Sequence, residues 1–423
     1  MLSKYKKEDL TNHLNLYNKW VFLKEKTLEE FMSDVNRPNI MDFRTHKKRV
    51  AIWTGPALEP WDKAKVDEGM AGSETWASYL AEAFVRKGYE VTVYNDLRTP
   101  DKKKPTYEPV RDPSGNVIGV VKYIDYSMLQ EDIQYLYIDY FISSRSIEPI
   151  RHSIHCGRSF VMIHDVWLHA DRKHDLMSWK VYRYAYLSDW HGDFLRHYHE
   201  GMPKEKMFQT ANGIPWDLYK DVDSVTKKNQ MVYSSSPDRG LYQLLQMLPR
   251  IRAEVPDFQL YVSYGFFNWE ASSKMRNDQG SLDLIAKIKE LMKQPGVVYL
   301  DRIDKKTLAK HQMESKVWAM PEWFDETFSI TALEAGASKN AIVTTAKGGL
   351  LSTVGGAGQL LSPEGLDRDK EYPKAYTDEF IQRTVQLLKD ETLRKEWAEK
   401  AYNKMKIYNW DTIADGWIAQ FKN

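Results

Sequence analysis

The chain has 423 residues, which exceeds the size that one hydrophobic core usually serves, so its length predicts two domains. Hydrophobic residues make up 42% of it, with 14 Trp and 25 Tyr among them, and this composition excludes an intrinsically disordered protein. The 60 Lys and Arg residues nearly balance the 59 Asp and Glu residues. The net charge of +1 gives no whole-chain electrostatic reason to expect nucleic acid or an anionic membrane as a partner, although a local basic groove would suffice.

The cysteine count and the hydropathy of the chain indicate the cellular compartment to expect. Cys156 is the only cysteine, so neither an intrachain disulfide nor a multi-cysteine zinc site can form, and a reducing compartment is favoured. Residues 1–10 are polar with several lysines, and no segment approaches the roughly 18 apolar residues of a membrane span. We therefore expect a cytoplasmic protein without a transmembrane segment or an obvious export signal.

Residues 1–48 predict a helical, Lys-rich extension that contains several aromatic residues. A basic amphipathic stretch of this kind can dock on lipid or on a partner. More often such a run is a solvated helix face packed on its own domain, and we favour that interpretation. Peripheral contact with a membrane or a partner stays open as the alternative.

Residues 49–215 alternate between short apolar strands and helical stretches. This alternation predicts a parallel sheet covered by helices on both faces. The turn Pro113-Ser114-Gly115-Asn116 marks a hairpin inserted into the domain. The predicted strands are 49–55, 90–94, 107–110, 117–123, 136–143, 160–164 and 185–188, and the main helix is 73–87.

A second series of the same kind begins after the polar stretch 219–229 and predicts a second doubly wound domain. Two such domains enclose a cleft at the carboxyl ends of their strands, where ligands bind in this architecture. The end of the chain is mostly helical, with Trp397, Trp410 and Trp417 as candidate apolar anchors. The predicted strands are 231–234, 258–264, 297–300 and 316–320, and the predicted helices are 240–253, 282–292, 328–337 and a segment after residue 304.

The most informative segment is 321–336 (PEWFDETFSITALEAG), in which seven residues separate Glu326 from Glu334. Apolar spacing predicts a helix over 328–337, with Thr327 or Ser329 as its N-cap. First-turn amides lack an intrahelical partner and, together with the helix dipole, form a natural phosphate cradle. Two carboxylates beside such a cradle can accept hydrogen bonds from sugar hydroxyls, a combination that suits a nucleotide sugar. The cradle amides are those of Phe328, Ser329 and Ile330.

This segment, followed by the apolar strand and Gly-rich turn at 341–349 (AIVTTAKGG), resembles the donor-binding core of the large retaining family of GT-B glycosyltransferases that includes sucrose synthases and phosphatidylinositol mannosyltransferases. The resemblance implies an α/β fold in which two Rossmann-like domains face a central cleft and a C-terminal helix crosses back onto the first domain. It also implies transfer from a nucleoside diphosphate sugar to an acceptor hydroxyl, with retention and without a metal or other cofactor. The expected division is 1–48, 49–215 for the acceptor domain, 216–400 for the nucleotide-sugar domain, and 401–423 for the last helix.

Further positions match the pattern of that family. Gly72 and Ser73 stand where the family has a Gly-rich loop before a helix, and His164 resembles its strand-end histidine. Arg239 stands where the family carries a basic residue that neutralises the donor diphosphate. Many members have a second arginine upstream, where this chain reads Ser234-Ser235-Ser236. Serine hydroxyls such as that of Ser235, the amine of Lys347 or an arginine from elsewhere could compensate for it.

The resemblance implies a role for each candidate. Arg239 and the helix amides would stabilise the leaving diphosphate, Glu326 would orient hydroxyls of the donor sugar, and His164 would meet its reacting face. These three residues are the candidate catalytic residues, and Glu334 would bind the ribose hydroxyls. The candidate donor-binding residues are Gly72, Ser73, Ser235, Arg239, Glu326, Thr327, Phe328, Ser329, Ile330, Glu334 and Lys347.

Other interpretations stay open. A GT-B epimerase or phosphorylase is one rival, and a non-catalytic nucleotide-sugar-binding or scaffold protein of the same fold is another. Five histidines between residues 152 and 174 prompt a zinc hypothesis, which we do not favour because no helical His pair with zincin spacing occurs. The acceptor is not specified: a glycan, a lipid-linked glycan, a protein and a modified nucleic acid all fit, and we expect residues 98–126 and 167–186 to select it.

Overall fold

The computed structural model describes residues 47–99, 101–151, 156–168, 180–199 and 201–422, so nearly all of the predicted helical extension lies outside the described residues. The chain divides into two compact units. Of the described residues, the first unit comprises those in 47–62, 81–162 and 180–184, and the second comprises those in 63–80, 163–168 and 185–422. The segments 63–80 and 163–168 therefore belong to the second unit, although residues of the first unit precede and follow each of them.

An eight-stranded sheet occupies the N-terminal half of the chain, in the order β3-β4-β2-β1-β5-β6-β7-β8. β1 pairs in parallel with β2 and β5, β2 pairs in parallel with β4, and β5 with β6. β1 and β5 are almost entirely buried, as parallel strands covered on both faces are. The strands are β1 (Arg49–Gly55), β2 (Glu90–Asn95), β3 (Thr106–Arg111), β4 (Val117–Asp125), β5 (Ile138–Ser144), β6 (Cys156–Met162), β7 (Arg183–Tyr186) and β8 (Met207–Gln209).

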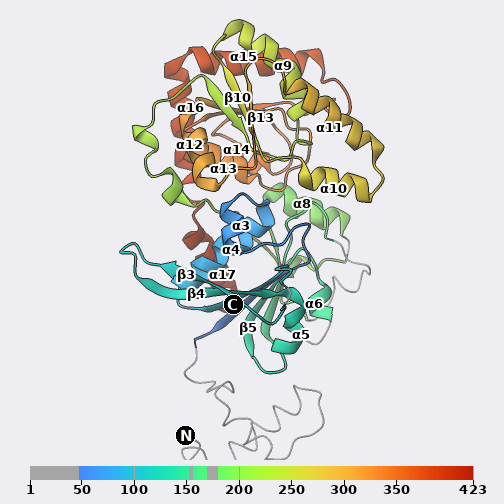
Figure 1. Cartoon of the computed structure of the whole chain (residues 1–423), viewed down its shortest axis with the longest axis vertical. Helices are drawn as coiled ribbons and strands as arrows, with labels where there is room; N and C mark the ends of the chain where they lie inside the picture. Colours follow the sequence, from blue (N-terminus) through green and yellow to red (C-terminus); the bar gives the residue numbers. More distant parts are fainter. Residues whose placement is uncertain (1–46, 100, 152–155, 169–179, 200, 423) are drawn as a thin grey trace, which may run out of the picture. The chain divides into compact units, whose positions relative to one another are not determined.

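The predicted hairpin is present in the domain, and it forms part of this sheet. β3 and β4 pair antiparallel, from Thr106 opposite Tyr123 to Arg111 opposite Val117, and β4 joins the parallel sheet through β2. The hairpin, cyan in Figure 1, extends beyond the edge of the sheet. Hydrophobic periodicity does not report which strands are neighbours, so the sequence could not place it.

Helices and short 3-10 turns connect these strands, and two further 3-10 turns, η4 and η5, follow β8. α4 is the longest of them in the N-terminal half and begins at Gly72, one residue before the predicted start. Ser188 caps α8 by accepting a hydrogen bond from the backbone N–H of His191. The helices are α3 (Lys63–Asp67), α4 (Gly72–Arg86), α5 (Leu129–Asp132), α6 (Glu148–Arg151) and α8 (Asp189–Tyr198), and the 3-10 turns are η2 (Tyr126–Met128), η3 (Lys204–Lys206), η4 (Trp216–Tyr219) and η5 (Val222–Ser224).

The second unit contains two three-stranded parallel sheets, ordered β11-β10-β9 and β12-β13-β14. Every residue of β9, β12 and β13 is buried, and β10 and β13 lie among helices in Figure 1. Because the strands within each sheet are parallel, their carboxyl ends share one edge. The strands are β9 (Gln230–Tyr233), β10 (Gln259–Ser263), β11 (Val297–Asp301), β12 (Val317–Met320), β13 (Ala341–Thr345) and β14 (Gln359–Leu361).

The helices of the second unit follow the predicted alternation, with two exceptions, α10 and the short α14. α10 was not predicted, and its apolar residues lack a clear helical stripe. The helices are α9 (Leu241–Glu254), α10 (Phe267–Met275), α11 (Gln279–Leu291), α12 (Lys305–Glu314), α13 (Ile330–Ala337), α14 (Leu350–Val354), α15 (Lys374–Lys389), α16 (Glu391–Met405) and α17 (Trp410–Lys422).

α17 packs through the tryptophans that the sequence suggested as anchors. Trp410 and Trp417 are buried, Trp410 stacks on Tyr79 of α4, and the ring of Trp417 lies 6.0 Å from that of Trp76. Trp397 on α16 is only half-buried and carries Lys400 over its ring. In the described residues, no helix is both long and apolar enough to cross a membrane.

Candidate functional site

The turn between β9 and α9 presents Arg239 at the edge of its sheet. The backbone N–H of Arg239 donates to the carbonyl of Ser236, which also accepts from the hydroxyl of Tyr233 at 2.8 Å. Gly240 caps α9 with a φ of +101°, a conformation that favours glycine. A Cβ at Gly240 would overlap the carbonyl oxygen of Pro321, so the glycine lets this turn approach the segment after β12.

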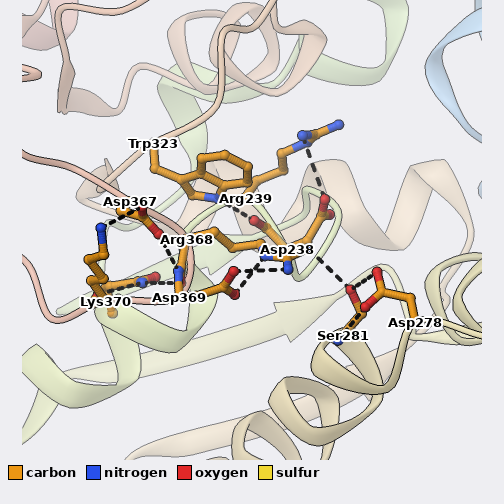
Figure 2. Close-up of polar contacts among 10 residues, drawn as sticks. Asp238, Arg239, Asp278, Ser281, Trp323, Asp367, Arg368, Asp369 and Lys370 are labelled. Atoms are coloured by element: carbon orange, nitrogen blue, oxygen red, sulfur yellow. Dashed lines mark hydrogen bonds and ion pairs between the residues drawn. The ribbon is translucent and has the colours of Figure 1, made fainter.

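Arg239 lies beside the segment 322–326. Its Nε is 3.6 Å from Oε1 of Glu326, and its Nη1 is 3.6 Å from Oδ2 of Asp238. The guanidinium lies 3.3 Å from the ring centroid of Phe324, which is a close cation-π contact. The indole of Trp323 donates to the carbonyl of Asp238 at 2.5 Å, and Figure 2 shows it directed at that turn while Arg239 extends from it.

The pKa values of two carboxyl groups in this segment are raised. Glu322 is fully buried, and burial, followed by the charge of Glu326, raises its pKa well above the ordinary value despite the opposing effect of Arg239. Burial also raises the pKa of Glu326, again against Arg239. Oε1 of Glu322 accepts from the backbone N–H of Phe324 at 3.0 Å, and its Oε2 has no hydrogen-bond partner in the part of the chain that the structure describes. Arg239 thus opposes the effect of burial on the pKa of both carboxyl groups.

The helix after this segment is α13, which starts at Ile330 and not at the predicted residue 328. Ser329 is its N-cap, with a φ of +71° and an Oγ that accepts from the N–H of Ala332 at 3.4 Å. Of the two predicted N-caps, the structure therefore selects Ser329. Thr327 instead donates through Oγ1 to the backbone carbonyl of His164 at 2.8 Å. The amides before Ala332 lie at the positive end of the helix dipole.

The Gly-rich turn after β13 holds the loop that carries Glu326. The N–H of Gly349 donates to the carbonyl of Glu326 at 2.5 Å. A Cβ at Gly349 would overlap the carbonyl of Thr327, and one at Gly348, whose φ is +55°, would lie 2.6 Å from the carbonyl oxygen of Glu326. Only glycine permits this approach. Lys347 extends beside the loop, with Nζ 3.8 Å from Oδ1 of Asp325.

Glu334 points into the protein from the second turn of α13. It is 6% exposed, and its Oε2 accepts from Nε2 of Gln312 at 3.1 Å. The hydroxyl of Tyr219 donates to Oε1 of the same glutamine at 2.8 Å. The nearby amine of Lys305 is also buried, and burial lowers its pKa while Glu334 raises it. Glu334 is thus part of a buried polar network, and its predicted contact with a ribose stays a prediction.

The segments 63–80 and 163–168 bring three more candidates into the second unit. Gly72 begins α4, and a Cβ there would lie 3.3 Å from Cδ1 of Ile330. The hydroxyl of Ser73 donates to Glu74 at 2.7 Å. The half-buried His164 lies two residues beyond the end of β6, and its ring is 4.8 Å from that of Trp76 in an edge-on contact. The second unit therefore brings Gly72 next to α13 and His164 next to Thr327.

Among the described residues, the side chains of two candidates, Phe328 and Ser235, form no hydrogen bond or ring contact with another candidate side chain. Phe328 is buried, with its ring 5.4 Å from that of Tyr408, so only its backbone can serve a ligand. Ser235 is half-buried in the turn before Arg239, next to the buried Ser234. The hydroxyl of Ser234 has no hydrogen-bond partner among the described residues.

Sequence reasoning missed Tyr264, which directly follows β10. Its φ is +144°, a strained value for a residue with a Cβ. Burial, followed by the charges of Glu74 and Asp238, raises the pKa of its phenol, whereas Arg302 and Arg239 lower it. It also missed Glu322 and Phe324, because their importance depends on Arg239, which is distant in sequence. A tyrosine before a glycine at a strand end was the only signal for Tyr264.

No group of three His, Cys, Asp or Glu side chains that could hold a metal ion occurs within the described ranges. Of the histidines that prompted the zinc hypothesis, only His164 is described, since residues 152–155 and 169–179 lie outside those ranges.

Solved structures match nearly the whole chain and show its fold. Sucrose-phosphate synthase from Thermosynechococcus elongatus has a TM-score of 0.64 at 15% identity, covering 89% of this chain and 98% of its own. HepE of Anabaena in a complex with UDP and glucose has a TM-score of 0.61 at 14% identity, with 88% and 99% covered. A UDP-forming trehalose-phosphate synthase from Burkholderia xenovorans has a TM-score of 0.61 at 11% identity, with 89% and 99% covered. At these identities the likeness shows the fold, which is the predicted α/β fold of the GT-B glycosyltransferases.

The family comparison is more specific. Residues 218–404 match the family model "Glycosyl transferases group 1", and this segment holds Arg239, Glu326 and Glu334. Residues 218–404 therefore form a group 1 glycosyltransferase domain, and the resemblance found in the sequence is confirmed to that extent. Comparison with curated protein sequences gave no match.

Proposed function

We propose that the protein transfers a sugar from a nucleoside diphosphate donor to an acceptor hydroxyl, with retention at the anomeric carbon and without a metal ion. One observation carries the proposal: within the group 1 domain, Arg239 lies 3.6 Å from Glu326, just before the amino end of α13. Arginine and helix amides are the groups that bind diphosphates, and a carboxylate beside them can bind sugar hydroxyls. A likeness to HepE, solved with UDP and glucose, supports the same donor class.

Each group has a task in this reaction. Arg239 and the backbone amides of residues 328–330 bind the diphosphate and stabilise the charge that grows on it as the donor bond breaks. These fixed positive groups are the reason for proposing that no metal is needed. Lys347, whose amine is held near Asp325, can add a second positive charge. The Ser235 hydroxyl and the Gly72-Ser73 turn are additional donor contacts.

The chemistry balances without a protein nucleophile. The bond between the anomeric carbon and the phosphate oxygen breaks, the acceptor oxygen bonds to the same face of that carbon, and the acceptor proton passes to the leaving phosphate. Glu326 orients hydroxyls of the donor sugar, His164 meets its reacting face, and Glu334 binds the ribose. Oε1 of Glu334 accepts no hydrogen bond from a described residue, which is consistent with that last task.

The reaction is tested with a panel of UDP-, ADP- and GDP-sugars in the presence of EDTA, by measuring the release of nucleoside diphosphate and the thermal stabilisation that each donor gives. We expect slow hydrolysis of one donor without an added acceptor, and faster release when a suitable acceptor is present. Stabilisation by a donor without any turnover would instead favour a non-catalytic binding protein. The acceptor class and a cytoplasmic location, which the single cysteine favours, remain proposals.

A further inference from the structure

The guanidinium of Arg239 lies over an aromatic ring, while its N–H groups make no hydrogen bond with a described residue. Both of its ion pairs have N–O distances of 3.6 Å, too long for hydrogen bonds. It donates no side-chain hydrogen bond to any residue in the described ranges, although a guanidinium has five N–H donors. Its closest contact is the ring of Phe324, at 3.3 Å from the centroid. An arginine held in this way keeps its donors for a ligand.

Phe324 itself is fixed from two sides. Its backbone N–H donates to Oε1 of Glu322 at 3.0 Å, and that carboxyl is fully buried. The neighbouring indole of Trp323 donates to the carbonyl of Asp238, in the turn that carries Arg239 (Figure 2). These contacts join the segment after β12 to the turn after β9. The ring of Phe324 and the guanidinium of Arg239 therefore belong to two segments that a hydrogen bond joins.

We propose that Phe324 is a positioning residue for the donor-binding arginine: its ring supports the guanidinium of Arg239, so that the N–H edges face the diphosphate before the donor arrives. This inference rests on the proposed function and adds a residue to it. Preorganised donors are more effective than mobile ones, because no side chain must be ordered when the donor binds or the bond breaks. Phe324 acts only through Arg239 and does not touch the reacting atoms.

The test is a double-mutant cycle with the donor found in the panel. Phe324→Leu should lower kcat/KM about tenfold, within the range that a cation-π contact supports, whereas Phe324→Tyr should stay within about twofold of the wild type. In the Arg239→Ala background, Phe324→Leu should have almost no further effect. Trp397→Leu is the matched control, since it removes the cation-π pair with Lys400 on α16 and should leave kcat/KM unchanged.

The outcomes separate the two proposals. The positioning role is wrong, while the proposed function stands, if the wild type turns over a donor and Phe324→Leu has the same kcat/KM. It is equally wrong if Phe324→Leu lowers kcat/KM by the same factor in the Arg239→Ala background as in the wild-type background. If the wild type neither hydrolyses nor binds any donor, both are wrong. Melting temperatures accompany each assay, and Phe324→Met replaces the Leu variant should the latter fail to fold.

Discussion

Buried carboxylates follow strands in both units, but their surroundings differ. In the first unit, Asp96 after β2 accepts from the N–H of Ala57 at 3.0 Å and pairs with Arg98 at 3.1 Å. Asp125 at the end of β4 accepts from both the N–H and the hydroxyl of Ser127. Their hydrogen bonds hold loops in place, so these carboxylates have a structural role.

In the second unit, the carboxyl groups after β12 have few such partners. Oε2 of the buried Glu322 has none among the described residues, and Glu326 faces an arginine that donates no side-chain hydrogen bond within the same part of the chain. Native proteins rarely leave such groups unsatisfied without a reason. The comparison supports our proposal that the carboxyl groups after β12 belong to the donor site, whereas Asp96 and Asp125 build the fold.

The largest expected effect is on Arg239. Arg239→Ala removes the positive charge that stabilises the leaving diphosphate, so we expect kcat to fall on the order of 10²- to 10³-fold, with a small change in melting temperature. Arg250→Ala is the matched control, because Arg250 on α9 forms only an exposed pair with Asp378 at 2.8 Å. Initial rates of nucleotide release measure the activity of both variants. Near-normal activity of Arg239→Ala would contradict the inference that the second unit holds the donor site and the first unit only structural carboxylates.

The next effect comes from the glycine turn that holds the Glu326 loop. Gly349→Ala forces a methyl group against the backbone of Thr327, so we expect a loss of about 1–3 kcal/mol in the free energy of unfolding and a lower kcat together. Gly416→Ala on α17 meets nothing within 4 Å and should be neutral or slightly stabilising. Urea unfolding and donor turnover are measured on both variants. Full activity in Gly349→Ala would show that the loop position is not critical.

A smaller effect is expected in the first unit, and on stability alone. Asp125→Ala removes the cap of η2, so the free energy of unfolding should fall by about 0.5–2 kcal/mol while kcat/KM stays within about twofold. Denaturant unfolding measures the change in stability, and steady-state kinetics measure kcat/KM. A large kinetic effect would place a functional carboxylate in the unit where we infer only structural ones.

The last prediction concerns pH dependence. The folded-state pKa of Glu322 lies above its ordinary value of 4.5 because of burial, so its contribution to stability is complete below about pH 4.5 and is lost as the pH rises through the folded pKa. Glu322→Gln keeps the neutral form at every pH. The variant should therefore gain stability relative to the wild type as the pH rises. Melting curves from pH 5 to 9 measure this difference, and a constant difference would contradict a raised pKa of Glu322.

The sequence predicted the alternation of strands and helices because buried parallel strands and amphipathic helices have distinct periodicities. It also located Glu326 and the Gly348-Gly349 turn, since a motif of fixed spacing is local information. It could not predict that Phe324 lies against Arg239, because that contact depends on how segments that follow strands of two different sheets pack together. The start of α13 was misplaced because Ser329 has a positive φ and caps the helix from outside it.

The most direct test of the central claim is calorimetric titration of the wild type and Arg239→Ala with UDP, ADP and GDP, each compared with its monophosphate. If Arg239 and the amino end of α13 bind the diphosphate, the wild type should bind at least one diphosphate at least about tenfold more tightly than its monophosphate, and Arg239→Ala should lose that preference. A preference that survives in Arg239→Ala, or a wild type without any preference, would contradict the account.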